Sequence, residues 1–423
     1  MKRNSTRATS QFKRELLAWA FLPMMLGAIE GGVVGILTKR LFEGTVDDTV
    51  LDWSVGALAA AQGFANISSF MWAALSHGKH KIQFITALKI VAVLMIGSVA
   101  FIPISPVGLG LLLCCVVGTR ICWTGVVTLR TTVWQANYPR SSRTVIAGKI
   151  YIIQALVLAV VSFSVGEAMK IDENAFRWVY PIAASFGIIG AWIYSKIRVV
   201  NHKELLREEI SAPEYVSLIP WRAFKLLIED KAFAKYMSCQ FILGVGNLML
   251  TAPLILVLSD SFTLDVLEEI LIVSTVPILM IPWSTPLWAK LLDNMHVLTF
   301  RAIHSWFFVA SSLCFAVSIA FGFVPGLWIG AVIRGIAFGG GVLAWNLGHQ
   351  DYAPVEQSGR YMGLHVTLTG IRGLFAPALG VALYTALLSQ NFYAGPIVFS
   401  VGAGLSALGG IGFILLSKER KNV

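Results

Sequence analysis

Residues 333–374 read IRGIAFGGGVLAWNLGHQDYAPVEQSGRYMGLHVTLTGIRGL. The segment has two apolar stretches, the first with Arg334 and the second with Arg372, and a polar turn at residues 349–360 joins them. About 20 apolar residues span the hydrocarbon core of a bilayer, and a charge within such a stretch is retained only at a cost, facing a cavity or a partner. The segment therefore predicts two membrane helices and makes both arginines candidate functional residues.

The rest of the chain is equally apolar. Of its 423 residues, 56% are hydrophobic and 13% charged, and the mean hydropathy is +0.73, which is far above the range of soluble proteins. Apolar windows recur along the chain and predict an all-α, polytopic membrane protein with about twelve transmembrane helices. We expect these helices at residues 16–37, 53–75, 82–103, 107–129, 145–166, 178–197, 232–258, 267–291, 300–323, 326–347, 361–387 and 393–416.

The basic residues, which give the chain a net charge of +10, lie in the breaks between apolar stretches. They therefore indicate how the chain is oriented across the membrane and do not indicate nucleic-acid binding. Three loops, near residues 38–52, 167–177 and 260–269, are poor in basic residues. They contain only Lys39, Arg40, Lys170 and Arg177. Cytoplasmic loops carry the excess of lysine and arginine, so both termini are expected in the cytoplasm of a multi-pass protein of the cytoplasmic (plasma) membrane. Lys89, near one end of its helix, is expected to extend to the interface.

The cysteines predict neither a disulfide nor a metal site. All five, Cys114, Cys115, Cys122, Cys239 and Cys314, lie within apolar stretches, where thiols behave as small hydrophobic groups. The basic N-terminal tail leads into a long apolar run without a clear cleavage site, so we interpret residues 16–37 as the first membrane helix and not as a signal peptide.

Internal matches indicate that the chain is a repeat of two halves. Three short segments recur at a nearly constant shift of 214 to 217 residues: Leu26, Gly27 and Glu30 with Leu243, Gly244 and Asn247; Trp72 to His80 with Trp288 to His296; and Arg120, Gly125 and Tyr138 with Arg334, Gly339 and Tyr352. Between the halves, composition shifts to a charged, proline-containing segment. We therefore expect an N-terminal bundle at residues 1–198, a cytoplasmic linker at 199–231 and a C-terminal bundle at 232–423.

Two six-helix halves with cytoplasmic termini and a basic central loop resemble the major facilitator superfamily. That family carries a G-x-x-x-D-R-x-G-R-R/K signature between helices two and three and again between helices eight and nine. Here PLWAKLLDNMH at residues 286–296 keeps the acidic residue as Asp293, and LSHGKHK at residues 75–81 keeps only the basic end. Arg120 with its following glycine is similar to the fourth-helix signature, displaced by one position.

The resemblance implies two pseudo-symmetric six-helix bundles around a cavity lined by helices one, four, seven and ten. The repeat places Glu30, Arg120, Asn247 and Arg334 on those four helices near the middle of the membrane. They form the predicted substrate-binding and coupling site, with Arg372 as a fifth candidate beside His365 and Thr369 on one helical face. Two arginines and one carboxylate favour an anionic substrate, because guanidinium groups bind carboxylate and phosphate bidentately.

Each of these residues also has a purely structural interpretation. Glu30, within a double G-x-x-x-G pattern, would be locked in an ion pair at a close helix contact; otherwise it would exchange partners and carry a proton. Arg120 and Arg334 would bond carbonyl groups at a bundle interface. Arg372 would pack behind the cavity.

The turn at residues 349–360 is expected on the cytoplasmic side, near the loop that contains Asp293. Asp293 would pair with Arg360, or bond a helix N-terminus, when an inner gate closes. The alternative is an ordinary solvated loop.

These features predict a secondary active transporter that moves a small anionic solute by alternating access, with protons as the coupling ion. Efflux of amphipathic compounds is the second transport hypothesis, for which Trp123, Phe338 and Trp345 would line an aromatic cavity. The third is a scaffold or sensor that keeps the fold without transport. No enzyme motif is present in the sequence, and we expect no cofactor, no nucleic-acid partner and a monomer in the lipid bilayer.

Overall fold

The computed structural model of this chain describes residues 2–76, 78–138, 140–211, 224–353, 358–390 and 393–421. Almost all of these residues are helical, and no strand occurs among them. The expectation of an all-α protein is confirmed. The described helices, in chain order, are α1 (Lys2–Gly27), α2 (Gly31–Phe42), α3 (Asp48–Ile67), α4 (Ser69–Leu75), α5 (Lys81–Ser98), α6 (Pro106–Asn137), α7 (Arg140–Ile171), α8 (Phe176–Ser195), α9 (His202–Ser211), α11 (Leu226–Glu229), α12 (Lys231–Leu248), α13 (Thr251–Ser261), α14 (Val266–Ile270), α15 (Val276–Asp293), α16 (Val297–Phe321), α17 (Val324–Leu347), α18 (Ser358–Leu388) and α19 (Ala394–Lys421).

The described part of the chain contains eleven helical segments long and apolar enough to cross a membrane. The polytopic membrane fold is thus confirmed, and each of these segments overlaps a predicted one. The remaining prediction, at residues 53–75, corresponds to α3 and α4, which a turn at Ser68 separates. The first turns of α3 contain Asp48 and Asp52, and these charges lower its mean hydropathy.

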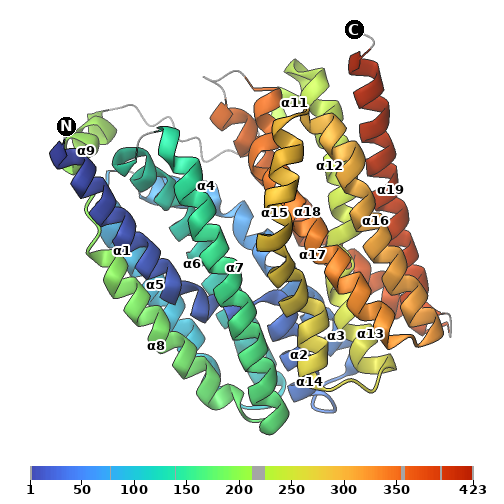
Figure 1. The fold of residues 1–423 in the computed structure, drawn as a ribbon. Coiled ribbons are helices and arrows are strands. Elements are labelled where there is room, and N and C mark those ends of the chain that lie inside the picture. The colour runs from blue at the N-terminus through green and yellow to red at the C-terminus, as the bar shows by residue number, and fades with distance from the viewer. Residues whose placement is uncertain are drawn as a thin grey trace. The chain divides into compact units, whose positions relative to one another are not determined.

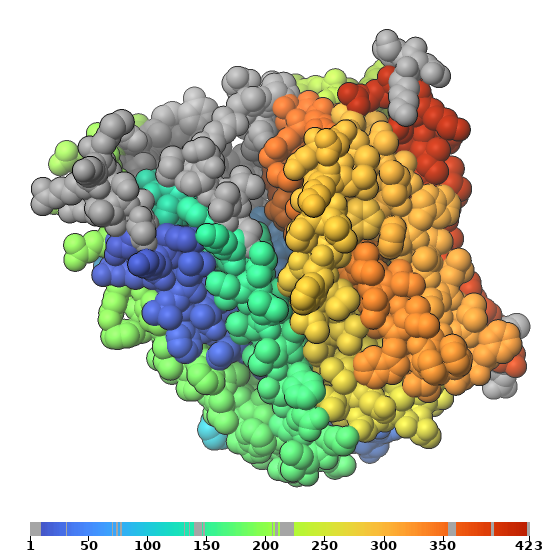
Figure 2. All heavy atoms as spheres, viewed as in Figure 1, coloured from blue at the N-terminus to red at the C-terminus, as the bar shows by residue number. Residues whose placement is uncertain are grey.

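Contacts between helices divide the chain into two compact units: unit 1, Met1–Glu30 with Ala65–Ile219, and unit 2, Gly31–Phe64 with Pro220–Val423. In unit 1, α1 packs against α7 and α8, and α5 packs against α6 and α8 (Figure 1). In unit 2, α19 packs against α12 and α16, and α17 against α15 and α16. Figure 2 shows α15 and α16, in yellow to amber, along one face of unit 2. The sequence-based division at residues 198 and 232 stays a prediction.

The histidines matched by the repeat occupy the same structural position in their units. His80 caps the N-terminus of α5, where its ring nitrogen accepts a hydrogen bond from the amide of Gln83. His296 caps α16 in the same way and accepts from the amide of Leu298. Such caps satisfy an amide that a helix leaves without a partner. The match at a shift of 216 therefore reflects one local structure used twice.

The matched tryptophans likewise each pack against a glycine of a long helix that follows. A Cβ atom added to Gly125 would lie 2.9 Å from the Trp72 ring, and one added to Gly340 would lie 3.0 Å from the Trp288 ring. Both contacts join the helix before a histidine cap to the long helix that carries Arg120 or Arg334. These contacts support an internal repeat independently of the apolar pattern.

Glycines also permit close helix contacts, as the G-x-x-x-G pattern predicts. A Cβ atom on Gly27 would lie 2.8 Å from Val161 in unit 1, and one on Gly35 would lie 2.6 Å from Ile255 in unit 2. Small residues let helix backbones approach closely in membranes. These positions thus fix the packing of α1 on α7 and of α2 on α13.

Replacing Gly63 by alanine is expected to lower stability, because its Cβ atom would lie 2.3 Å from the carbonyl carbon of Gly373. Backbone atoms cannot turn aside as a side chain can, so α3 and α18 would have to separate. Overpacking of this kind costs about 1–3 kcal/mol. Thermal unfolding of the purified protein measures the loss. Gly110→Ala is the control, since no atom lies within 4 Å of its added Cβ, and equal midpoints for the two variants would contradict the contact.

Candidate functional site

The first predicted membrane helix is interrupted at the candidate site. The chain leaves helical conformation between Gly27 and Gly31, so that Glu30 lies in the break between α1 and α2. Two carbonyl groups in this break are bonded by side chains from other helices. The Tyr180 hydroxyl donates to the Ala28 carbonyl at 2.9 Å, and the Arg120 guanidinium donates to the Ile29 carbonyl at 2.7 Å. Irregular backbone within a membrane needs such partners, because hydrocarbon offers none.

The second half repeats this arrangement. The predicted seventh membrane helix is interrupted at Met249 and Leu250, between α12 and α13. Arg334 donates to the Thr251 hydroxyl, at the first residue of α13, over 2.8 Å. Its guanidinium carbon also lies 5.4 Å from the centre of the Phe338 ring, within cation–π range. Arg120 and Arg334, matched by sequence, therefore each bind the interrupted first helix of their own half.

The structure brings the predicted site residues together in pairs. Glu30 is half-buried and close enough to Arg120 for electrostatic interaction, within unit 1. In unit 2, Asn247 and Arg334 line one small cavity of about 10 Å³, whose other lining residues are Leu250, Phe308, Ser311, Ser312, Phe315 and Phe399. That volume is close to the minimum that holds a single water molecule. A single cavity shared by all four residues stays a prediction.

Arg372 is buried within unit 2, where it bonds the backbone of α12. Its guanidinium donates to the Gln240 carbonyl at 2.5 Å and approaches the Thr369 hydroxyl at 3.4 Å. A Cβ atom on Gly244 would lie 2.4 Å from the guanidinium, so only glycine leaves room for it there. This geometry matches the structural interpretation of Arg372, although a role in solute binding stays a prediction.

The predicted inner-gate pair is placed only in part. Asp293, the last residue of α15, is exposed, whereas the side chain of Arg360 lies outside the described residues. A different acidic residue bonds a helix N-terminus here. Asp351 accepts a hydrogen bond from the amide of Val297, at the start of α16, over 2.7 Å. The pairing of Asp293 with Arg360 stays a prediction.

Two sets of ion pairs lie at the ends of α2 and α14, and neither set is part of the site predicted from the sequence. Lys39 lies 2.9 Å from Asp52 and 3.1 Å from Asp260, and Asp260 also accepts a hydrogen bond from the Tyr384 hydroxyl. The Lys39 and Asp52 side chains are only 6% and 7% exposed. These contacts connect α2 with α3, α13 and α18 within unit 2. Sequence reasoning assigned Lys39 to an outward loop and had no means to find its partners.

The neighbouring residue makes the second set. Arg40 pairs with Glu269 of α14 and also donates to the Leu264 carbonyl at 3.2 Å. Glu269 is almost fully buried, with 1% of its side chain exposed. One sequence signal could have suggested these contacts. Asp260 and Glu269 lie in one predicted outward loop, and the basic residues Lys39 and Arg40 lie in another.

Lys89 does not extend to the interface as expected. It is fully buried, and its ammonium lies 3.1 Å from the centre of the Tyr194 ring. The aromatic ring takes the place of water beside the ammonium group, and α5 packs against α6 and α8. Lys89 also interacts electrostatically with Glu15 and Arg130, two further buried charges of unit 1.

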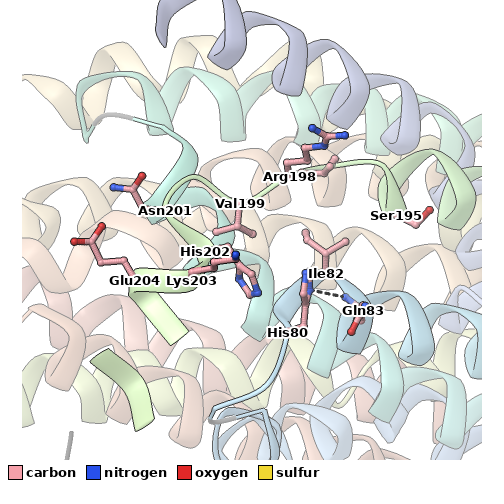
Figure 3. Close-up of a pocket in the computed structure, with 11 residues that line it drawn as sticks. His80, Ile82, Gln83, Ser195, Arg198, Val199, Asn201, His202, Lys203 and Glu204 are labelled. Carbon is pink, nitrogen blue, oxygen red and sulfur yellow. Dashed lines mark hydrogen bonds between the residues drawn. The ribbon is translucent and has the colours of Figure 1, made fainter. Parts of the chain in front are cut away.

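A cavity of about 710 Å³ opens at one end of unit 1. Figure 3 shows that residues from the start of α5 and from the segment between α8 and α9 line it, among them His80, Arg198 and His202. The rings of His80 and His202 lie 4.0 Å apart, centre to centre. None of the predicted site residues lines this cavity, so its size does not identify the substrate site.

Comparison with known proteins agrees with this architecture. The family model described as Major Facilitator Superfamily matches residues 155–377. Among solved structures, a mutant of the nucleoside transporter NupG is similar with a TM-score of 0.74 at 12% identity, over 95% of this chain and 99% of that chain. The D-xylose-proton symporter gives 0.73 at 10% identity, over 96% of each chain. The peptide transporter POT in complex with sulfate gives 0.72 at 11% identity, over 97% of this chain and 94% of that chain. No curated protein sequence matches.

Proposed function

This chain belongs to the Major Facilitator Superfamily of membrane transporters, and on that premise we propose that it moves a small anionic solute by alternating access. The observation that carries the proposal is the matched pair Arg120 and Arg334. Each binds the interrupted first helix of its own half, at 2.7 Å and 2.8 Å. A carbonyl or hydroxyl group carries no net charge, so neither of these two hydrogen bonds neutralises the guanidinium group. Glu30 supplies one negative charge against these two positive ones.

The interrupted helices supply a means of movement. A solute carboxylate or phosphate that binds the Arg120 guanidinium would compete with the Ile29 carbonyl for the same donors. When the guanidinium group exchanges the Ile29 carbonyl for the solute, the conformation of the chain between α1 and α2 would change. Helix interruptions at a binding site are a recurring device of secondary transporters, and the corresponding break between α12 and α13 gives the second half the same response.

The ion pairs of Lys39 and Arg40 are proposed as the outer gate. They attach α2 and α3, which come from the first half of the sequence, to α13, α14 and α18 from the second half. The charge pattern predicts that these helix ends face outward. Opening to that side requires the pairs to separate and become hydrated, and their burial in this structure corresponds to a closed outer gate. We further propose a monomer in the cytoplasmic membrane, with both termini in the cytoplasm.

Protons are the proposed coupling ion, with Glu30 as the carrier. Glu30 lies within electrostatic reach of Arg120, so a solute that occupies Arg120 would change the surroundings of the carboxyl group that we propose as the proton carrier. One solved relative is named as a proton symporter, which agrees with this coupling.

Reconstituted protein is expected to accumulate its solute when a proton gradient is imposed. Candidate anions, such as carboxylates and phosphate esters, are tested as radiolabelled solutes in proteoliposomes. One pH unit is worth about 1.4 kcal/mol per proton, so a one-unit gradient should give roughly tenfold accumulation at one proton per solute. A protonophore serves as control and should abolish accumulation but leave equilibration intact. Flux that does not respond to the gradient would contradict proton coupling, and no flux of any anion would contradict the anionic substrate.

Efflux of amphipathic compounds is the second candidate, and a non-transporting scaffold or sensor is the third. In this structure, two of the aromatic residues that would line a cavity for efflux contact other residues of the chain. Trp123 is buried against Trp19, and the Trp345 ring nitrogen donates to the Thr369 hydroxyl at 3.2 Å. These contacts favour the anion hypothesis over an aromatic drug site.

A further inference from the structure

Unit 2 contains a second group of buried basic residues, apart from Arg334. Arg301 on α16 and Arg372 on α18 are 2% and 6% exposed, and His365 on α18 is fully buried. Electrostatic interactions connect the three: Arg372 with Arg301, and His365 with both. We call Arg301, His365 and Arg372 the cationic cluster.

The polar atoms of this cluster are incompletely bonded. Both ring nitrogens of His365, and the Nε atoms of Arg301 and Arg372, have no hydrogen-bond partner among the described residues. Neither arginine has a carboxylate within ion-pair distance there. Two acidic residues of unit 2 bond other groups: Asp351 accepts from the amide of Val297, and Asp230 accepts from the Tyr361 hydroxyl. A buried charge without a partner costs several kcal/mol.

Unit 1 shows how the same fold neutralises such a group. There Lys89 and Arg130 are buried together, and Glu15, which is 1% exposed, interacts electrostatically with Lys89. Glu15 accepts hydrogen bonds from the Trp134 ring nitrogen and from the Tyr138 hydroxyl, the latter at 2.8 Å. Two cations are thus offset by one internal carboxylate.

Tyr352 is the repeat counterpart of Tyr138, and its hydroxyl has no hydrogen-bond partner among the described residues. The rings packed against it are those of Tyr236, His296 and Phe233, with centres 5.0, 5.5 and 5.6 Å away. Phe233 is fully buried. Among the described residues, the groups packed against Tyr352 are therefore aromatic rings, whereas Tyr138 contacts the Glu15 carboxylate.

We propose that the cationic cluster binds a small oxyanion, of the carboxylate, phosphate or sulfate class. Arg301 from α16, and Arg372 and His365 from α18, would supply the donors. His304 orients Arg301, because its Nδ1 atom accepts from that guanidinium at 3.2 Å while Nε2 donates to the Ala337 carbonyl at 2.7 Å. This site is distinct from Arg120 and Arg334, and it does not depend on the proposed transport function.

Thermal unfolding of the purified full chain in detergent tests the proposal, with tryptophan fluorescence as the signal. The protein begins in a zwitterionic buffer with minimal salt. Sodium phosphate, sulfate or acetate is then added in millimolar steps, with sodium chloride as a halide comparison. A ligand that binds only the folded state raises the midpoint saturably. We expect a rise of about 2–5 °C for at least one oxyanion, and a smaller effect of chloride.

Variants separate this site from general salt effects. Arg301→Gln and Arg372→Gln should lose the saturable rise, and in the low-salt buffer their midpoints should be no lower than the parent midpoint, since an unpaired buried charge has gone. His365→Gln, which changes no full charge, should weaken apparent affinity about tenfold. Lys235→Gln is the control: it removes an exposed charge from the same unit and should respond as the parent protein does.

Two results would overturn the proposal: no saturable rise with any oxyanion, or an undiminished rise in both arginine variants. Either result leaves the transport proposal standing, because solute flux is measured separately. Conversely, oxyanion binding in a protein that transports no anion would refute the proposed function and retain this site.

Discussion

Replacing Arg334 by alanine is expected to abolish solute transport, with initial rates at least about 100-fold below those of the parent protein. The substitution removes a guanidinium that binds the break between α12 and α13 and contributes half of the matched positive charge. Loss of one partner from a buried, hydrogen-bonded charge interaction costs about 2–5 kcal/mol, and each 1.4 kcal/mol is a factor of ten. Uptake into proteoliposomes, normalised to the amount of reconstituted protein, measures the change. Arg120→Ala should give a loss of similar size, because the repeat gives it the same position.

Two further variants distinguish a binding role from a structural one. Thr251→Val keeps the arginine and removes its hydroxyl partner, so it should alter folding stability more than substrate affinity. Arg334→Lys keeps the charge without bidentate geometry and should retain partial activity with a raised KM. Full transport by a well-folded Arg334→Ala protein, as judged by size-exclusion chromatography and unfolding midpoint, would refute the site assignment.

Reversing one charge of the proposed outer gate is expected to reduce transport about 30-fold or more, and reversing both should restore much of it. Glu269 is nearly fully buried beside Arg40, so Glu269→Arg places two positive charges together, away from water. An uncompensated buried charge of this kind costs about 3–5 kcal/mol. Arg40→Glu combined with Glu269→Arg recreates an ion pair of opposite direction. Uptake by the single and double variants, analysed as a double-mutant cycle, measures the coupling between the two side chains.

The exposed pair of Lys235 and Glu419 provides the matched control. Its ammonium and carboxylate are 2.7 Å apart, but the side chains are 54% and 58% exposed, and exposed pairs contribute about 0–1 kcal/mol. Lys235→Glu should therefore leave transport nearly unchanged. Failure of the double reversal to exceed either single variant would show that Arg40 and Glu269 do not act as a pair. A large defect in Lys235→Glu would show that surface charge in general controls the rate.

Some of the candidate site followed from sequence because the repeat is a local pattern. Arg120 and Arg334 were paired by a constant shift along the chain, and the structure gives both the same relation to an interrupted helix. The interruptions themselves were not predicted, since residues 28–30 and 249–250 are flanked by apolar residues on both sides. Hydropathy averaged over about 20 residues does not register a break of two or three residues.

Other predictions failed where a side chain had more than one possible environment. Lys89 was expected at the interface because a long side chain near a helix end can extend there. Its neighbours in the fold, Tyr194 and the helices around α5, decide against this. The ring is 105 residues away in sequence, and no pattern around Lys89 indicates it.

The sequence by itself determined that this is an all-α membrane protein, where its helices lie, and that its two halves are related. These properties depend on apolar content and spacing within about 20 residues, which the bilayer selects directly. The tertiary structure alone decided which charges meet. Arg40 and Glu269 are 229 positions apart, and Arg120 and Ile29 are 91 apart. Such pairs form because burial makes every unpaired charge costly, and that cost depends on how the helices pack.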